Sequence, residues 1–227
     1  MGERLVIALG GHALVKPGER GTIPEQRANV RAALAGVVEL IREGHRVLIT
    51  HGNGPQIGHI LIRSEEARGK AYELPLDVGV AQSQGETGYL IQRALAVAGV
   101  TRPVVSLVTQ VRVDSADPRL REPSKPGGPV CDEARAAELR RRGASVFDDP
   151  GRGLRRHVPS PRPVEIVAAR LISKLFDDGV VVIAAGGGGI PLCGDEGVEA
   201  VIDKDLAAAE LALAVGADRM LNLTAVE

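Results

Sequence analysis

The feature that most constrains the fold is a set of three apolar runs that each end in glycines. They read "LVIALGGHA" from Leu5, "RVLITHGNGPQIG" from Arg46 and "VVVIAAGGGGIP" from Val180. β-Branched residues favour strands and glycine adopts backbone angles closed to other residues, so each run predicts a buried strand followed by a tight turn. One such turn is equally well explained as a plain strand-to-helix connection, but amides in turns of this type also hold anions. Three of them together predict an anion site.

The order of the predicted strands and helices indicates an α/β fold. Apolar runs that resemble strands buried on both faces lie at residues 5–9, 47–50, 104–108, 180–185 and 220–223. Helical spacing of apolar residues separates them at residues 24–44, 163–179 and 203–213. The sequence therefore predicts a mostly parallel sheet sandwiched by helices. In such sheets ligands bind at the carboxyl ends of the strands, where the glycine turns fall.

Residues 114–163 interrupt this pattern. They are rich in proline, glycine, arginine and aspartate, with one short helical run at residues 132–142. Ordinary connections are much shorter, so this segment is either a flexible loop or a small subdomain. We favour a lid-like subdomain inserted over the sheet of a single domain that spans residues 1–227.

Composition excludes several classes of function. The net charge is -1, with 28 basic and 29 acidic residues, two Phe, two Tyr and no Trp, so neither a basic surface nor base-stacking aromatics predict a nucleic-acid partner. No apolar stretch is long enough for a membrane span and the N-terminus lacks a signal peptide, so we expect a cytoplasmic protein without a membrane partner. Cys131 and Cys193 form no CxxC pair, and no metal site is predicted from residues of the chain.

Other motifs are weak or absent. The P-loop pattern GxxxxGK[ST] does not occur, and "GNGPQIG" has the wrong spacing for a dinucleotide fingerprint. "AQSQG" falls one glycine short of the GxSxG turn of hydrolases and follows a predicted helix start, which argues against Ser83 as a nucleophile. His51 and His59 match no metal-ligand spacing and are expected to be loop-packing residues.

Two lysines suggest the chemistry. The chain carries its positive charge mainly on arginine, yet Lys125 lies in "PSKPGGP" within the insertion and Lys204 in "AVIDKDLAAA". A lysine ammonium on a flexible stem can follow a phosphoryl group as it moves, whereas either lysine alone would be read as an ordinary surface residue. Glycine turns, two isolated lysines and a lid together favour phosphoryl transfer, in which a protein mainly positions reactants and neutralises charge.

An ordered set of motifs along the whole chain resembles the carbamate kinase family of the amino acid kinase superfamily. The matching stretches include "VIALGGHAL", "HGNGPQIG", "PLDVGVAQSQGETGY", "PSKPGGP", "GGGGIP" and "GVEAVIDKDLAAAELA". The resemblance implies the reaction ATP + carbamate ⇌ ADP + carbamoyl phosphate, run toward ATP in arginine or agmatine breakdown. It also implies ATP/ADP with Mg²⁺, a homodimer, and no general base, because carbamate is already an anion.

The resemblance assigns roles to individual positions. Lys125, Lys204 and Asp205 would be catalytic, with both lysines on the phosphoryl oxygens and the aspartate orienting them. Carbamate and the moving phosphoryl group would bind to Gly10, Gly11, His12, Gly52, Asn53 and Gly54, mainly through backbone amides. The nucleotide side would comprise Gly186, Gly187, Gly188, Gly189, Asp203 and Thr224. A side chain in the glycine run would then occupy the place of a phosphate.

The sequence departs from the family at a few places. His12 stands where the family has asparagine, and Gln82, Glu86 and Thr87 replace apolar residues. The chain ends at Glu227, where the family continues, so residues 1–227 are expected to form an incomplete kinase domain with weak ATP binding and slow turnover. Two alternatives follow: an inactive module that binds anions or dimerises, and another amino acid kinase that acts on a small carboxylate.

Overall fold

The computed structural model describes residues 2–16, 18–149 and 153–223, and its centre is a five-stranded parallel sheet. The strand order is β12 (Arg219–Leu223), β1 (Arg4–Leu9), β2 (Arg46–His51), β9 (Val181–Ile183) and β3 (Val104–Ser106). Every neighbouring pair is parallel, as the register Leu9↔His51 between β1 and β2 illustrates. All five strands overlap the predicted runs, and the predicted fold class is confirmed.

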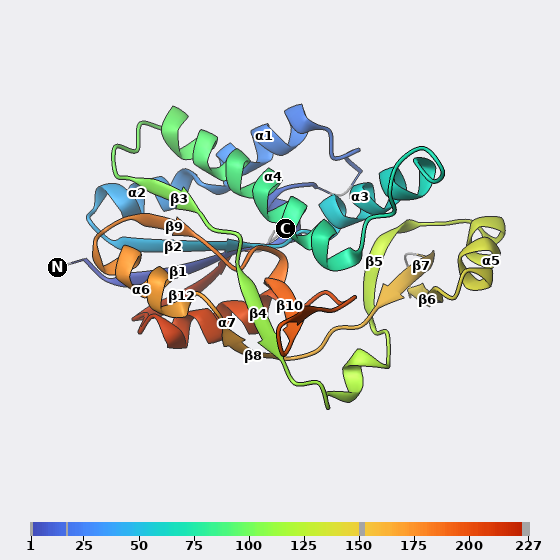
Figure 1. The fold of residues 1–227 in the computed structure, drawn as a ribbon. Coiled ribbons are helices and arrows are strands. Elements are labelled where there is room, and N and C mark those ends of the chain that lie inside the picture. The colour runs from blue at the N-terminus through green and yellow to red at the C-terminus, as the bar shows by residue number, and fades with distance from the viewer. Residues whose placement is uncertain (1, 17, 150–152, 224–227) are drawn as a thin grey trace.

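Helices cover both faces of this sheet (Figure 1). One face packs against α1 (Ile23–Ala33), α2 (Ala35–Arg42) and α4 (Leu76–Val97), and the other against α6 (Ala169–Asp177) and α7 (Lys204–Ala214). Alternate residues of β1 point to opposite faces, because Leu5 and Ile7 join the first core and Val6 joins the second. Burial on both faces explains why the strands read as continuous apolar runs.

A second, mixed sheet lies beyond the edge of the first. Its order is β11 (Glu196–Gly197), β10 (Ile190–Cys193), β4 (Gln110–Val113) and β8 (Pro163–Ile166). The sequence predicted a helix from residue 163, which is wrong for β8 because this segment pairs antiparallel with β4, with Val111 opposite Ile166. The helix begins only at Ala169. The glycine turn η3 (Gly186–Gly188) connects β9 of the first sheet with β10 of the second.

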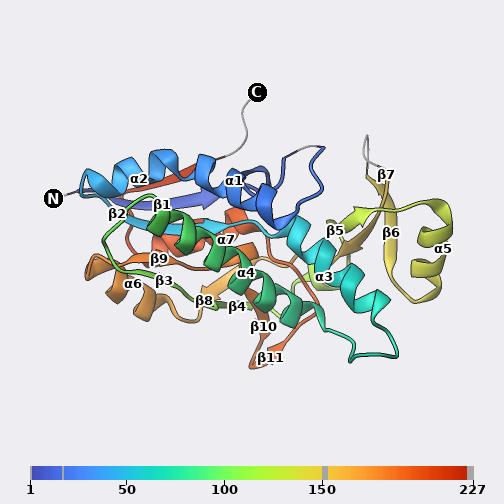
Figure 2. The same cartoon turned by 90° about the horizontal axis from the view of Figure 1, so that it is seen from above.

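Most of the insertion folds into a separate small lobe. An antiparallel sheet of β5 (Lys125–Val130), β7 (Gly153–Val158) and β6 (Ser145–Asp149) packs against α5 (Glu133–Arg141), and a short turn η2 (Pro118–Leu120) precedes it. Figure 2 shows this lobe projecting at one end of the molecule beside α3 (Gly54–Glu66). The lobe thus brings Lys125, the first residue of β5, to the end of the main sheet where α3 begins.

Two local features complete the fold. The helix predicted for residues 24–44 is divided into α1 and α2 at Leu34, although its amide still bonds to the Val30 carbonyl at 3.0 Å. The first glycine turn forms the short helix η1 (Gly11–Ala13). Across the described residues, none of the helices combines the length and the apolar character needed to span a bilayer.

Candidate active site

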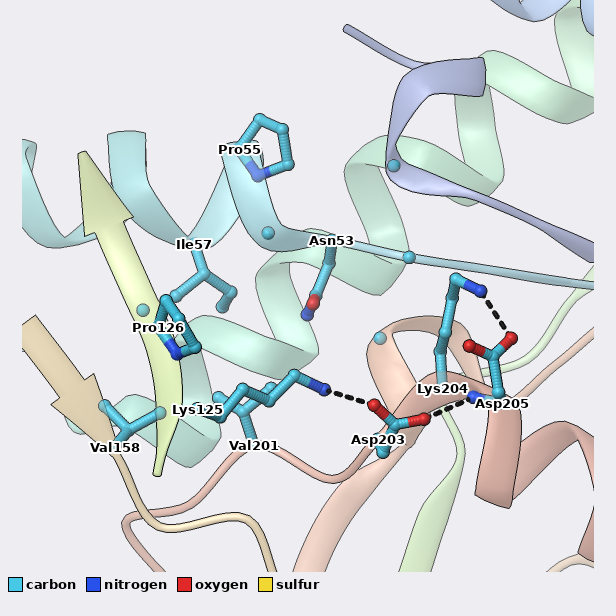
Figure 3. Close-up of a pocket in the computed structure, with 15 residues that line it drawn as sticks. Asn53, Pro55, Ile57, Lys125, Pro126, Val158, Val201, Asp203, Lys204 and Asp205 are labelled. Carbon is cyan, nitrogen blue, oxygen red and sulfur yellow. Dashed lines mark hydrogen bonds and ion pairs between the residues drawn. The ribbon is translucent and has the colours of Figure 1, made fainter. Parts of the chain in front are cut away.

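A cavity of about 220 Å³ lies where η1, the start of α3, the start of α7 and strand β5 meet (Figure 3). Nine of the residues predicted for the site line this cavity: Gly11, Gly52, Asn53, Gly54, Lys125, Gly187, Asp203, Lys204 and Asp205. The cavity also has an apolar wall that the sequence does not predict, formed by Pro55, Ile57, Pro126, Val158 and Val201. Apolar residues carry no sign of a site in the sequence, and only the folded chain brings them beside the lysines.

Some predicted residues do not line the cavity. Four predicted glycines are not among the residues that line it: Gly10, Gly186, Gly188 and Gly189. His12 lies in η1, but the structure does not describe its side chain. Thr224 lies outside the described residues. The amide of Gly10 donates to the Leu223 carbonyl at 2.9 Å and that of Gly52 to the Leu9 carbonyl at 3.0 Å. These two amides are therefore occupied by the sheet, contrary to their predicted role as ligand donors.

The amides that remain open belong to helix starts. Gly11 is the first residue of η1 and Gly54 the first residue of α3, so their N–H groups have no acceptor within the helix. Both residues line the cavity. The start of α3, a helix of 13 residues, also carries partial positive charge, which favours an anion at this position.

Packing alone already requires glycine at each position of the four-glycine run. A Cβ atom on Gly186 would lie 2.3 Å from the His51 ring, one on Gly187 2.0 Å from the Asn53 amide, and one on Gly188 2.5 Å from the Ile202 carbonyl. A Cβ on Gly189 would lie 2.2 Å from Val111. A side chain at any of these positions would therefore meet protein atoms. Contact of the run with a nucleotide phosphate stays a prediction.

Lys125 reaches the cavity from the inserted lobe. Its ammonium donates to the Ile202 carbonyl at 2.8 Å and lies 3.5 Å from the Asp203 carboxylate. Burial lowers the pKa of Lys125, and the nearby Lys204 acts in the same direction, while Asp203 and Asp205 oppose the shift. A partly desolvated ammonium held at the cavity interacts strongly with an anion that enters it.

Lys204 and Asp205 form a second charged group, at the start of α7. The Lys204 ammonium lies 2.5 Å from the Asp205 carboxylate, and the same carboxylate oxygen accepts a 2.8 Å hydrogen bond from the Asn222 amide of β12. Asn222 was not predicted, although the motif "LNLTAVE" holds it. The Asp205 carboxylate is thus held by Lys204 and by Asn222 at the same time.

Asp203 caps α7 and at the same time contacts Lys125. Its carboxylate accepts hydrogen bonds from the amides of Asp205 at 2.9 Å and Leu206 at 3.4 Å. Burial acts to raise the pKa of Asp203, but the charge of Lys125 and these two amides outweigh it, and the net shift is downward. Asp203 therefore stays ionised and couples the inserted lobe to the main domain.

Ser83 is a structural residue. It is fully buried in α4, donates to the Val80 carbonyl at 2.7 Å and accepts from the Asn53 amide nitrogen at 2.9 Å. No base contacts its hydroxyl among the described residues, and it does not line the cavity. The hydrolase interpretation of "AQSQG" has no support, and the hydroxyl instead holds Asn53 against the glycine turn.

Comparisons with known proteins agree with this geometry. The profile of the amino acid kinase family matches residues 3–227. A carbamate kinase of Pyrococcus furiosus is 47% identical over 238 residues, covering 100% of this chain and 76% of that protein. Among solved structures, carbamate kinase from Giardia lamblia bound to citric acid superposes with a TM-score of 0.93 at 40% identity, covering 99% of this chain and 76% of that one. The same enzyme bound to AMP-PNP gives a TM-score of 0.87 at 40% identity, covering 98% and 74%. The chain therefore belongs to the amino acid kinase family, among the carbamate kinases.

Proposed function

We propose that this protein is a carbamate kinase, which transfers a phosphoryl group between ATP and carbamate. The observation that carries the proposal is the convergence of Lys125, Lys204 and the open amides of Gly11 and Gly54 on one cavity, in a chain 47% identical to a carbamate kinase. Two ammonium groups and two helix starts make this cavity a site for polyanions. Carbamate is proposed as the small substrate because the relatives are carbamate kinases.

The residues act by position and charge. In the direction of carbamoyl phosphate, a carbamate oxygen forms a bond to the γ-phosphorus while the bond from phosphorus to the β,γ-bridging oxygen breaks, and ADP leaves with that electron pair. Lys204 and Lys125 neutralise the charge on the transferring oxygens, and the amides of Gly11 and Gly54 bind the anion. No proton moves in this step, so no general base is needed, and the two carboxylates at the cavity, Asp203 and Asp205, pair with Lys125 and Lys204 instead.

The relative from Giardia lamblia has been solved with AMP-PNP, so a nucleotide is expected to bind to this chain as well. The resemblance of the motifs places it on the side of Gly187 and Asp203, which line the cavity. Mg²⁺ would enter with the phosphates. No group of three or more His, Cys, Asp or Glu side chains in the described part of the chain is arranged to hold a metal by itself. Mg²⁺ commonly binds through one or two carboxylates and substrate phosphates, and Asp203 and Asp205 at the cavity fit that donor set.

The inserted lobe within residues 114–163 is proposed to act as a lid. It carries Lys125 on β5, and it contacts the main domain through the pair of Lys125 with Asp203 and through α3. In the position that the structure shows, the lobe holds the Lys125 ammonium at the cavity, and opening of the lobe would remove this ammonium and admit water. A homodimer and a cytoplasmic location stay predictions.

ATP formation from ADP tests the proposed function. The chain is incubated with ADP, Mg²⁺ and either carbamoyl phosphate or acetyl phosphate, an acyl phosphate without the amino group, and ATP is measured by luciferase coupling. We expect kcat/KM for carbamoyl phosphate to exceed that for acetyl phosphate by at least about tenfold. Acetyl phosphate has a methyl group in place of the amino group, so polar groups of the protein that bind the amino group would lose their hydrogen-bond partner. Preference for acetyl phosphate would indicate a kinase for another carboxylate. Binding of ADP without turnover would indicate an inactive module.

A further inference from the structure

Ala185 has an unusual backbone conformation at the start of the glycine turn. Its φ and ψ are 51° and 32°, in the left-handed region, and it is the single residue other than glycine with positive φ in the described part of the chain. Alanine is disfavoured there because its Cβ approaches the following carbonyl. Such a conformation persists only where the surroundings impose it, and it often marks a functional site.

Two buried threonine hydroxyls support this conformation, beside the Gly188 amide, which donates to the Ala185 carbonyl at 3.0 Å within the turn. The Ala185 amide donates to Thr109 Oγ1 at 3.0 Å, and the Ala185 carbonyl accepts from Thr50 Oγ1 at 3.0 Å. Thr50 lies in β2 and Thr109 directly before β4, and both are 0% exposed. The N–H and the C=O of Ala185, which belong to two successive peptide units, are thus fixed from two different segments of the fold.

Thr109 is itself fixed from α4. The Gln84 side chain accepts from the Thr109 amide at 2.7 Å and donates to the Thr109 carbonyl at 3.1 Å, while the Thr109 hydroxyl donates to the Leu107 carbonyl at 3.0 Å. Because that hydroxyl gives its hydrogen to Leu107, it can only accept from Ala185. The donor and acceptor roles of Thr109 are therefore fixed, and its hydroxyl oxygen is oriented toward the Ala185 amide.

The turn leads directly to the cavity. Gly187 lies two residues after Ala185 and lines the cavity, and it packs against Asn53, which lines the cavity as well. Ser83 holds Asn53 through the 2.9 Å hydrogen bond, so α4 supports the glycine turn after β2 through Ser83 and the turn after β9 through Gln84 and Thr109. Rotation of the Ala185 peptide would move Gly187 away from Asn53 and disturb the wall of the cavity.

We propose that Thr50 and Thr109 are positioning residues for phosphoryl transfer, because their hydroxyls hold Ala185 in the conformation that places Gly187 in the cavity wall. The inference rests on the proposed function for its kinetic part. Neither threonine touches the cavity, so neither contacts the substrates directly.

The test uses the full chain with Thr109→Val, which keeps the shape of the side chain but removes the hydroxyl, and Thr109→Ser, which keeps the hydroxyl. Thr50→Val and Thr50→Ser form a second pair in case one valine variant fails to fold. The matched control is Thr87→Val, since Thr87 is equally buried in α4 and its hydroxyl has no partner among the described residues. We expect the valine variants at positions 50 and 109 to lower kcat/KM about tenfold or more, and the serine variants to stay within about threefold of the unmutated chain.

A further substitution distinguishes positioning from a general loss of packing. Glycine adopts the left-handed conformation without assistance, so Ala185→Gly in the Thr109→Val background is expected to restore most of the lost activity. The amide exchange of residues 185–188, measured without substrates, should accelerate in Thr109→Val and return toward normal in Thr109→Ser.

Three results would overturn the inference: Thr109→Val as active as Thr87→Val, Thr109→Ser as impaired as Thr109→Val, or no recovery with Ala185→Gly. If the unmutated chain forms no ATP, the proposed function fails, and the same series is then judged on ADP affinity and amide exchange. A chain that neither forms ATP nor binds ADP overturns both proposals.

Discussion

At the scale of the residue, His51 shows how burial determines protonation beside the cavity. Its ring is 1% exposed, packs beneath Gly186 and has Nδ1 2.9 Å from the Gly52 carbonyl. Burial lowers the pKa of His51 from 6.5 to about 4, and the hydrogen bond to Gly52 opposes the shift only in part. The imidazole is therefore neutral at physiological pH and supports the glycine turn by packing.

This neutrality predicts a loss of stability in acid. The unfolded imidazole takes up a proton as the pH falls below 6.5, while the folded one stays neutral until about pH 4, so unfolding gains protons within this window. Between pH 7 and pH 5 the folded chain should lose roughly 2 kcal/mol of unfolding free energy through His51 alone. Urea unfolding of the unmutated chain and of His51→Gln at both pH values measures the difference. An equal pH dependence in the two proteins would contradict the assignment.

The sequence predicted many individual site residues but not the reasons for them. Lys125, Lys204 and Asp205 were assigned from their motifs and lie together at the cavity. The glycine run was assigned to phosphate contact, whereas its atoms meet His51 and Asn53, because local sequence does not show which side chains a turn will approach. Asn222 was missed for the same reason, since its hydrogen bond to Asp205 joins two distant segments.

At the scale of the element, α3 connects the cavity to the inserted lobe. The helix starts at the cavity with Gly54, and near its other end Glu65 forms an ion pair with Arg135 of α5 and lies 3.9 Å from Arg156 of β7. These side chains are between 18% and 30% exposed, so water screens the pairs only partly. Glu65 therefore fastens the proposed lid to the helix that starts at the cavity.

Removing this carboxylate should loosen the lobe. In Glu65→Gln, we expect the opening free energy of the α5 amides to fall by about 1 kcal/mol, because Arg135 keeps its pair with Glu138 but loses the one that crosses to α3. Amide hydrogen exchange of residues 133–141 measures this opening free energy. Glu39→Gln is the matched control, since Glu39 pairs with Arg42 on the exposed surface of α2. Equal exchange in both variants would show that Glu65 does not restrain the lobe.

Elements with strong local patterns were predicted best. The buried strands and α7, with its Asp203 cap, carry their own signals in apolar runs and capping residues. The helical spacing of Val164 and Val167 predicts a helix at residues 163–166. Pairing with β4 instead makes this segment a strand. A four-residue strand has too few side chains for its period to be distinguished from that of a helix.

At the scale of the whole molecule, the cavity is assembled from segments that are distant in the chain. Lys125 comes from the inserted lobe, Lys204 from the start of α7, and the glycine turns from the ends of β1, β2 and β9. The parallel order of the central strands predicts that their carboxyl ends meet, and they do. The sequence predicts a subdomain over the sheet but not which helix it contacts, because the packing of β5 against α3 joins segments that are distant in the chain.

Substitution of the two cavity lysines, with a third lysine as control, tests whether phosphoryl transfer takes place in this cavity. ATP formation from carbamoyl phosphate and ADP is measured for Lys125→Met, Lys204→Met and Lys174→Met, where Lys174 is an exposed residue of α6 paired with Asp178. We expect each of the first two to lower kcat at least about a hundredfold, because each removes a charge that stabilises the transferring phosphoryl group. Lys174→Met should match the unmutated chain. Near-normal kcat in either cavity variant would contradict the claim that this cavity is where the phosphoryl group is transferred.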